Sequence, residues 1–138
     1  MVVRLTGPEI FLREWRGTPQ APADLFAAHW CQEEVCNGGF HQFFDNSTGV
    51  LGPEAAAASE HIGMPKLRAL VRRALAFFGE PYPRDRSARM GQLKAYAAAH
   101  PDAPKPFDSL DDEFFLLLRS EAGGWFTAAD SYAIAHGG

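Results

Sequence analysis

The sequence predicts an all-α fold: a single compact helical domain over residues 1–138, with about six to seven helices around residues 67–78 and 110–118. Apolar residues recur at helical spacing along residues 67–78, which indicates an amphipathic helix. Proline and glycine divide the rest of the chain into segments of helical length. Only residues 2–5 have the composition of a strand. The 138 residues, 46% apolar and 22% charged, have the length and balance typical of one globular domain.

Two helices are expected in the N-terminal part of the chain. Residues 9–16 follow Pro8 and have the length of a short helix. A proline-rich connector over residues 18–22 separates this helix from the second one. Asp24 is a favourable N-cap residue, because its side chain can accept a hydrogen bond from a free backbone N–H. We expect Asp24 to start a helix that runs to about Cys36.

Glycine and proline also mark the next three segments. Residues 37–39 are Asn-Gly-Gly and end the preceding helix, since Asn and Gly tolerate the left-handed conformation of a C-cap. A short helix over about residues 40–46 and a loop over residues 47–49 follow. Pro53 suits the first turn of a helix over residues 54–62.

The clearest helix begins at Pro65 and ends before Gly79. Its apolar residues follow an i, i+3, i+4, i+7 pattern and form one stripe of Leu67, Leu70, Val71, Ala74, Leu75 and Phe78. Residues 84–100 predict a fifth helix, which Pro101 closes. The residues of this helix that we expect to face inward are Met90, Leu93, Tyr96 and Ala97.

Two further helices complete the chain. Ser109 and Asp112 have the spacing of a capping box, and the acidic residues beside them complement a helix dipole. Residues 114–118 are all apolar, so we expect the helix that contains them to be central. Thr127 and Asp130 repeat the capping spacing before a last helix.

Charge is distributed unevenly along the chain, although the formal net charge is only −4. Residues 1–62 carry 3 basic and 8 acidic groups, residues 63–105 carry 9 basic and 3 acidic groups, and residues 106–138 carry 1 basic and 6 acidic groups. Either the acidic ends attract the basic centre within one fold, or the two kinds of patch attract different partners. We expect the attraction within the fold.

Composition argues against several classes of protein. No apolar stretch approaches the length of about 18 residues that a membrane span needs. The N-terminal residues lack the apolar core of a secretory signal. Cys31 and Cys36 alone cannot form a disulfide scaffold. We therefore expect a cytoplasmic protein that has no membrane partner and does not bind nucleic acid directly.

A short motif surrounds the glycine pair. Residues 33–49 are Glu-Glu-Val-Cys-Asn-Gly-Gly-Phe-His-Gln-Phe-Phe-Asp-Asn-Ser-Thr-Gly. This stretch resembles the pattern E-V-x-N-G-G-F-x-Q-F-F-x-N-S-x-G of the DNA-mimic-protein-like family. The resemblance continues through residues 53–55 and 61–63 and, more weakly, through residues 110–114, so that it covers residues 24 to about 120.

The resemblance implies a helical fold and a protein partner. The family is an all-helical domain, and its named member is an acidic protein that occupies a transcription regulator in place of DNA. A DNA mimic must present negative charge in place of phosphates, and the acidic ends of this chain would supply that charge if they fold together. We interpret the chain as a bacterial, non-enzymatic protein-interaction domain of unknown partner that resembles a DNA-mimic-type binder of a regulatory protein. An immunity- or antitoxin-like inhibitor would differ only in its partner, no cofactor is expected, and the oligomeric state stays open.

The predicted contact region is the corner from Glu34 to Gly49. The motif residues assigned to it are Glu34, Asn37, Gly38, Gly39, Phe40, Gln42 and Asn46. Glu34 lies in the last turn of a predicted helix, where negative charge opposes the dipole. We expect its carboxylate to turn past the glycines and accept hydrogen bonds from the free N–H groups at the start of the Phe40 helix. A role for Glu34 as a general base or as a partner contact is the alternative.

Gln42 and Asn46 lie four residues apart, on one face of the short helix. They either tie the following loop to the helix through hydrogen bonds to the backbone, or form a polar recognition surface. Both interpretations stay open. The aromatic residues of the motif, Phe40, Phe43 and Phe44, are expected to be core anchors.

The main alternative function is a small hydrolase or transferase with Glu34, His41 and Asp45 in a cleft beside the glycine turn. Further candidates for nucleophilic catalysis are Cys31, Cys36, Ser47 and Ser59, with His41 or His61 as the base. The chain has no Gly-x-Ser-x-Gly elbow, no Walker-type phosphate loop and no dinucleotide fingerprint. We therefore assign no catalytic residue.

The sequence contains two other candidate sites, one for zinc and one for phosphate or an acidic partner. His29, Cys31, Cys36 and His41 supply four possible zinc ligands within 13 residues. Their spacing argues against zinc, because residues 29 and 31 point to different faces of a helix, and the family pattern usually has Asn at the position of Cys36. A basic face of Lys66, Arg68, Arg72, Arg73, Arg84, Arg86 and Arg89 would suit phosphate, an acidic partner or the acidic ends of the chain itself.

Overall fold

The computed structural model of the chain describes residues 7–103 and 105–137. Within these ranges it contains seven α-helices, three 3₁₀ helices and no strand, which confirms the predicted all-α class. Residues 2–5, whose composition is strand-like, lie outside the described residues. The elements in chain order are α1 (Gly7–Arg16), α2 (Gln20–Asp45), η1 (Ser47–Leu51), α3 (Gly52–His61), α4 (Pro65–Leu75), η2 (Ala76–Phe78), α5 (Arg86–Ala99), α6 (Asp108–Ser120), η3 (Glu121–Gly123) and α7 (Trp125–Ala135).

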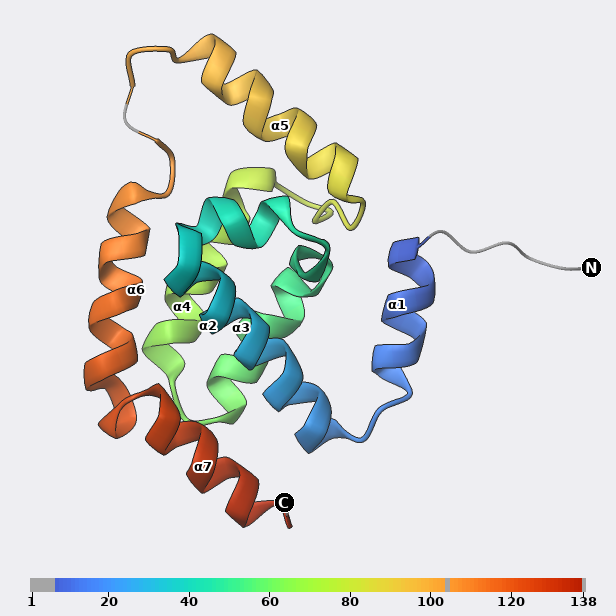
Figure 1. The fold of residues 1–138 in the computed structure, drawn as a ribbon, viewed down its shortest axis with the longest axis vertical. Helices are drawn as coiled ribbons and strands as arrows, with labels where there is room; N and C mark the ends of the chain where they lie inside the picture. The colour runs from blue at the N-terminus through green and yellow to red at the C-terminus, as the bar shows by residue number, and fades with distance from the viewer. Residues whose placement is uncertain (1–6, 104, 138) are drawn as a thin grey trace, which may run out of the picture.

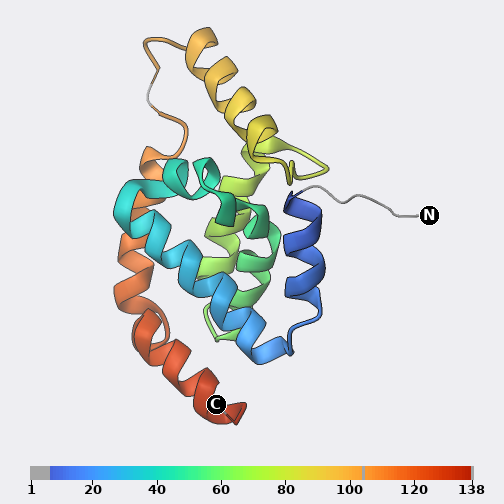
Figure 2. The ribbon, with the colours of Figure 1, turned by 45° about the vertical axis from the view of Figure 1, so that its right-hand side comes forward.

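Helix α3 packs against both α2 and α4, and these three helices form the centre of the molecule. Figures 1 and 2 show α1 on one side of this centre, α6 on the other side, and α5 across one end. Helix α7 follows α6 and contacts α2. No helix among the described residues is both long enough and apolar enough to cross a membrane.

Aromatic rings of the motif hold this centre together. Phe40 packs edge-on against Phe114 of α6, with ring centroids 5.3 Å apart. Phe44 packs edge-on against Phe78, with centroids 4.8 Å apart. Edge-on pairs of this kind stabilise a core by about 0.5–1.5 kcal/mol beyond the area they bury. These rings and that of Phe43 are all buried, so the expected core role of the three motif phenylalanines is confirmed.

The apolar stripe predicted along α4 is confirmed by the buried residues Leu67, Leu70, Val71 and Ala74. The central position predicted for the helix around residues 114–118 is wrong. Only Leu110 and Phe114 of α6 are buried, and Leu116 is 57% exposed. Successive helical residues point about 100° apart, so five apolar residues in a row cannot all face one core. Helix α6 lies at the edge of the bundle (Figure 1), and only one of its faces reaches the core.

The sequence predicts which segments are helical more accurately than it predicts the residue at which each helix begins. Asp24 does not cap α2 but lies inside it, because the helix begins one turn earlier. Ser109 and Thr127 likewise lie within the first turns of α6 and α7, and neither helix has a side-chain cap. Residues 47–49, predicted as a loop, belong to the 3₁₀ helix η1. For α2, α6 and α7, the helix starts before the residue that a local pattern marks as its start.

Asp24 joins three helices instead of capping one. Its buried Oδ2 accepts a hydrogen bond from the Tyr132 hydroxyl of α7 at 2.7 Å. The same oxygen lies 3.0 Å from Nδ1 of His61, at the end of α3. A carboxylate that is buried in this way needs such partners, because an unpaired buried charge is costly.

Helix α5 is held to the bundle by two buried residues, Arg89 and Leu93. Leu93 was predicted to face inward, and this is confirmed. Of the other predicted inward residues, Met90 and Tyr96 are half-buried and Ala97 is exposed. Arg89 precedes Leu93 by one helical turn and therefore shares its face, a signal in the sequence that identifies it as inward-facing.

Candidate functional site

The motif forms a bend in α2 at Gly38 and Gly39. Both residues leave the helical conformation, with φ −153° and ψ 22° at Gly38 and φ 76° and ψ 179° at Gly39. The second conformation is one that essentially only glycine adopts readily. The chain is helical on both sides, so that α2 consists of a first arm, residues 20–37, and a second arm, residues 40–45. The predicted break at the glycines and the short helix after it agree with this arrangement.

Asp111 of α6 caps the second arm. Its Oδ1 accepts a hydrogen bond from the backbone N–H of Phe40 at 2.9 Å. A Cβ on Gly39 would lie 2.4 Å from Asp111 Oδ2, so a glycine is needed for the carboxylate to approach this closely. Burial raises the pKa of Asp111, and the Phe40 hydrogen bond opposes that rise. The capping role expected of Glu34 is therefore wrong, because a residue 71 positions further along the chain fills it.

Glu34 joins the two arms through side chains. Its Oε2 accepts hydrogen bonds from Gln42 Nε2 at 2.7 Å and from Asn46 Nδ2 at 2.5 Å. A Cβ on Gly38 would lie 2.0 Å from Gln42 Oε1, so the glycine leaves room for this amide. Of the two interpretations left open for Gln42 and Asn46, the tie to the loop backbone is not what the structure shows, since both side chains bond to Glu34 of the first arm. We call these three residues the Glu34 clamp, since together they restrain the angle of the bend.

Arg89 of α5 binds the end of the second arm. Its guanidinium donates to the carbonyl oxygens of Phe44 at 2.8 Å and of Asn46 at 2.9 Å. It also donates to two carbonyls of the preceding loop, those of Pro83 at 3.1 Å and Arg84 at 2.8 Å. Carbonyl groups at the end of a helix lack intrahelical partners and carry partial negative charge, so they suit a cation. The prediction that grouped Arg89 with a basic face available to phosphate or an acidic partner is therefore wrong, because its guanidinium is buried.

The predicted contact residues divide into buried and accessible ones. Gly39 and Phe40 are buried and serve the fold. Asn37 and Gly38 are exposed, and the three residues of the Glu34 clamp are half-buried. The accessible part of the motif is therefore the outside of the bend and the outer edge of the clamp.

A groove runs beside the bend, between the second arm of α2, helix α5 and the start of α6. Its larger part has a volume of 460 Å³ and is lined by residues that include His41, Tyr96, His100, Phe107, Asp108 and Asp111. A shallower part of 170 Å³ follows α5 and includes Asp45 and Met90. His41 and Leu93 line both parts. We call the whole feature the bend groove.

The three residues of the enzymatic alternative do not share one cleft. His41 and Asp45 line the shallow part of the bend groove, whereas Glu34 lines neither part. The Glu34 carboxylate is instead occupied by two amide donors. The Asp45 carboxylate lies 3.7 Å from the guanidinium of Arg86. This geometry does not bring a base, an acid and a third group to a common point.

Three of the other candidate nucleophiles, Cys31, Cys36 and Ser59, also lack activation. Cys31 is buried and Cys36 is exposed, and burial raises the pKa of both thiols, which favours the unreactive protonated form. The Ser59 hydroxyl donates to the Ala55 carbonyl at 2.8 Å. Among the described residues, no group of three or more His, Cys, Asp or Glu side chains is placed to hold a metal ion.

Part of the basic centre of the chain is paired with the acidic ends. Four such ion pairs are Arg68 with Glu60, Arg73 with Glu113, Arg84 with Glu54, and Arg86 with Asp45. The Glu121 carboxylate also accepts the first backbone N–H groups of α4, from Lys66 at 2.7 Å and Leu67 at 2.9 Å. The expected attraction within the fold is thereby confirmed. A cleft of 660 Å³ includes Arg68, Arg72 and Arg84, of which the first and last already have these partners.

Comparison with known proteins identifies the family. Residues 17–136 match the family described as DMP19-like protein. Comparisons with curated proteins and with solved structures gave no match. The matched region contains the bend, the Glu34 clamp, Arg89 and the Asp111 cap, and it extends beyond residues 24–120 in both directions. The chain therefore belongs to the DMP19-like family, which suggests a protein of the DNA-mimic type.

Proposed function

We propose that this protein is a non-enzymatic interaction protein whose acidic face binds the basic, DNA-contacting surface of a regulatory protein. Membership of the DMP19-like family supports a role of the DNA-mimic type. The proposed contact region comprises the accessible part of the motif, Asn37, Gly38 and the Glu34 clamp, together with acidic residues of the neighbouring helices.

The division of charge among the helices carries this proposal. Four acidic residues lie on α2, four on α6 and one on α7, and the only basic residue of these three helices is Arg119. Helices α4 and α5 carry four and three basic residues and no acidic residue. Proteins that bind DNA neutralise its phosphates with Lys and Arg. Carboxylates presented in place of phosphates attract the same surface.

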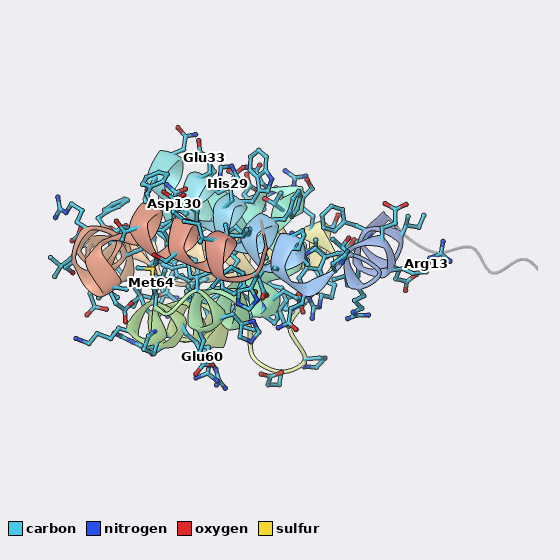
Figure 3. All side chains as sticks on the ribbon, turned by 90° about the horizontal axis from the view of Figure 1, so that it is seen from below. Arg13, His29, Glu33, Glu60, Met64 and Asp130 are labelled. Atoms are coloured by element: carbon cyan, nitrogen blue, oxygen red, sulfur yellow. The ribbon has the colours of Figure 1, made fainter. Side chains whose placement is uncertain are left out.

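Part of this acidic charge is available to a partner. The exposed carboxylates of Glu33, Asp108, Asp112 and Asp130 take part in no ion pair within residues 7–103 and 105–137. Glu33 and Asp130 lie on the same side of the molecule, away from Glu60 of the α3–α4 side (Figure 3). Two of the four carboxylates therefore share one side of the molecule, where a partner could contact both.

A pull-down from native lysate at low and at high salt tests the proposal. We expect one stoichiometric DNA-binding protein to be retained at low salt and lost at high salt, because screening weakens charge attraction between surfaces. Duplex DNA added to the complex should displace this protein from the bait. The double variant Glu33→Gln/Asp130→Asn should bind the partner about tenfold more weakly. The matched control, Glu14→Gln/Glu80→Gln, removes the same charge elsewhere and should leave affinity unchanged.

Three other outcomes would contradict the proposed partner, the interaction role or the proposed contact region. A stoichiometric partner that does not bind DNA, and that DNA does not displace, would favour an immunity- or antitoxin-like inhibitor. No partner at either salt would contradict the interaction role altogether. If the double variant Gln42→Ala/Asn46→Ala folds and retains full affinity for the partner, the bend is not part of the contact region.

A further inference from the structure

The larger part of the bend groove has two chemically different walls. Helix α6 contributes the carboxylates of Asp108 and Asp111. Tyr96 of α5 and His100, which directly follows that helix, contribute two rings that stack with centroids 4.3 Å apart and planes 23° apart. The volume of 460 Å³ lies within the range of about 300–1,000 Å³ typical of pockets that bind small groups.

The carboxylate wall has no ion-pair partner, although His41, which lines the same groove, acts electrostatically to lower the pKa of Asp111. Asp111 is half-buried, and burial together with the negative charges of Asp108 and Asp112 raises its pKa. Neither Asp108 nor Asp111 forms an ion pair with any of the described residues. Lys105 also lines the groove, but it is exposed and bonds to neither carboxylate. A positive charge placed in the groove would therefore lower the electrostatic cost of two crowded carboxylates.

Among biological cations, a guanidinium group fits both walls best. It is planar, donates two parallel hydrogen bonds to a carboxylate, and stacks on aromatic rings. A lysine ammonium would meet the carboxylates as a point charge but would not stack in this way.

We propose that the bend groove binds an arginine side chain of the protein partner, with its guanidinium between the Asp108 and Asp111 carboxylates and the Tyr96 ring. The inference rests on the proposed function, since the DNA-contacting surface of a regulatory protein supplies such arginines. It identifies one specific anchor point within the broader acidic face. Binding at this point also explains why the groove adjoins the motif.

The test uses a small probe and does not require the partner. The full chain, labelled with ¹⁵N, is titrated with N-acetyl-arginine amide and followed by NMR. N-acetyl-citrulline amide, which has nearly the same shape but no charge, is the matched control. We expect saturable shifts of the backbone amides of Gly38, His41 and Asp111 with the arginine probe only.

Three variants assign the binding to the two walls. Asp108→Asn removes one carboxylate without removing a hydrogen bond of the fold and should weaken probe binding about tenfold. Tyr96→Leu keeps an apolar side chain but removes the ring, and should weaken probe binding about threefold. Glu14→Gln on α1 lies outside the groove and should leave probe affinity unchanged. Spectra of residues away from the groove report whether each variant is folded.

Clear results would overturn the inference. Equal shifts with the citrulline probe, or unchanged affinity in folded Asp108→Asn, would exclude charge recognition. A lysine amide that binds as tightly as the arginine probe would exclude the stacking role of Tyr96. If a DNA-binding partner is captured but the arginine probe does not bind, the inference fails and the proposed function stands. If the probe binds in the groove but no DNA-binding partner exists, the proposed function fails instead.

Discussion

Asp111 of α6 accepts a hydrogen bond at 2.9 Å from the backbone N–H of Phe40, 71 residues earlier in the chain. This contact caps the second arm of α2 with a carboxylate from a different helix. Phe40 is buried, so its N–H needs a partner supplied by the protein when the bundle packs. The shape of the bend and the packing of α6 therefore depend on each other.

Two substitutions of Asp111 separate its hydrogen bond from its charge. Asp111→Ala removes the acceptor and should lower the free energy of unfolding by about 0.5–2 kcal/mol, the usual cost of losing a helix cap. Asp111→Asn keeps an acceptor oxygen and should lower the free energy of unfolding by less than Asp111→Ala does. Urea unfolding at neutral pH measures both changes. A larger loss for asparagine than for alanine would contradict the capping role.

The charge of Asp111 predicts a dependence on pH. Burial raises the pKa of this carboxyl above its ordinary value of 3.8. The folded protein therefore binds the proton more tightly than the unfolded chain, so this residue contributes most to stability below pH 3.8 and less as pH rises through the raised pKa. The difference in unfolding free energy between the natural protein and Asp111→Asn should thus fall with rising pH and then level off. A difference that increases with pH would contradict this sign.

Gly39 should not tolerate a side chain. Gly39→Ala places a Cβ 2.4 Å from Asp111 Oδ2 at a φ of 76°, so we expect a loss of unfolding free energy of more than about 1 kcal/mol. Gly91→Ala on α5 is the matched control, because its added Cβ would meet no atom within 4 Å. That control should gain about 0.5–1 kcal/mol, since alanine favours a helix over glycine. Similar effects of the two substitutions would contradict the steric argument.

Arg89 should be essential for stability although it is a charged residue. Arg89→Met leaves four carbonyl oxygens without their donor and should lower the free energy of unfolding by about 3 kcal/mol or more. Arg89→Lys should restore only part of this loss, because an ammonium lacks the fork of donors that a guanidinium provides. Arg72 on α4 is exposed, so Arg72→Met should change the free energy of unfolding by no more than about 0.5 kcal/mol. Equal losses at residues 72 and 89 would contradict the assigned role.

The Glu34 clamp predicts energetic coupling between the two arms. In a double-mutant cycle, Glu34→Ala and Gln42→Ala should show an interaction energy of about 0.5–3 kcal/mol, since each removes the same hydrogen bond. The neighbouring Glu33 is exposed, so a cycle of Glu33→Ala with Gln42→Ala should show an interaction energy near zero. Thermal or urea unfolding of the single and double variants supplies both values. Equal coupling in the two cycles would show that the hydrogen bond contributes nothing specific.

Most of the helices were predictable because their signals are local. Pro53 and Pro65 stand in the first turns of α3 and α4, as expected from a residue that needs no N–H partner there. Gly63 and Gly79 follow the ends of α3 and η2 with φ of 92° and 75°, conformations that glycine adopts readily. The glycine pair likewise marked the bend. Each of these effects depends on residues within about one helical turn.

The sequence identified several residues of the candidate site but not the contacts among them. Glu34, Gln42 and Asn46 were singled out by the motif, yet their mutual hydrogen bonds were not expected. The bend groove was not expected at all, because its walls come from α2, α5 and α6, which are distant in sequence. No local pattern states which helices will lie side by side.

The sequence by itself therefore determined the helical class, most helix boundaries to within a few residues, and the glycine bend with its aromatic anchors. Tertiary structure alone decided that Asp111 rather than Glu34 caps the second arm, and which backbone carbonyls bind the buried guanidinium of Arg89. It also placed α6 at the edge of the bundle despite its apolar run. The reason is physical: a turn or a helix end is set by neighbours along the chain, whereas a buried charge depends on partners about 40 to 70 residues away, which only packing brings within hydrogen-bonding distance.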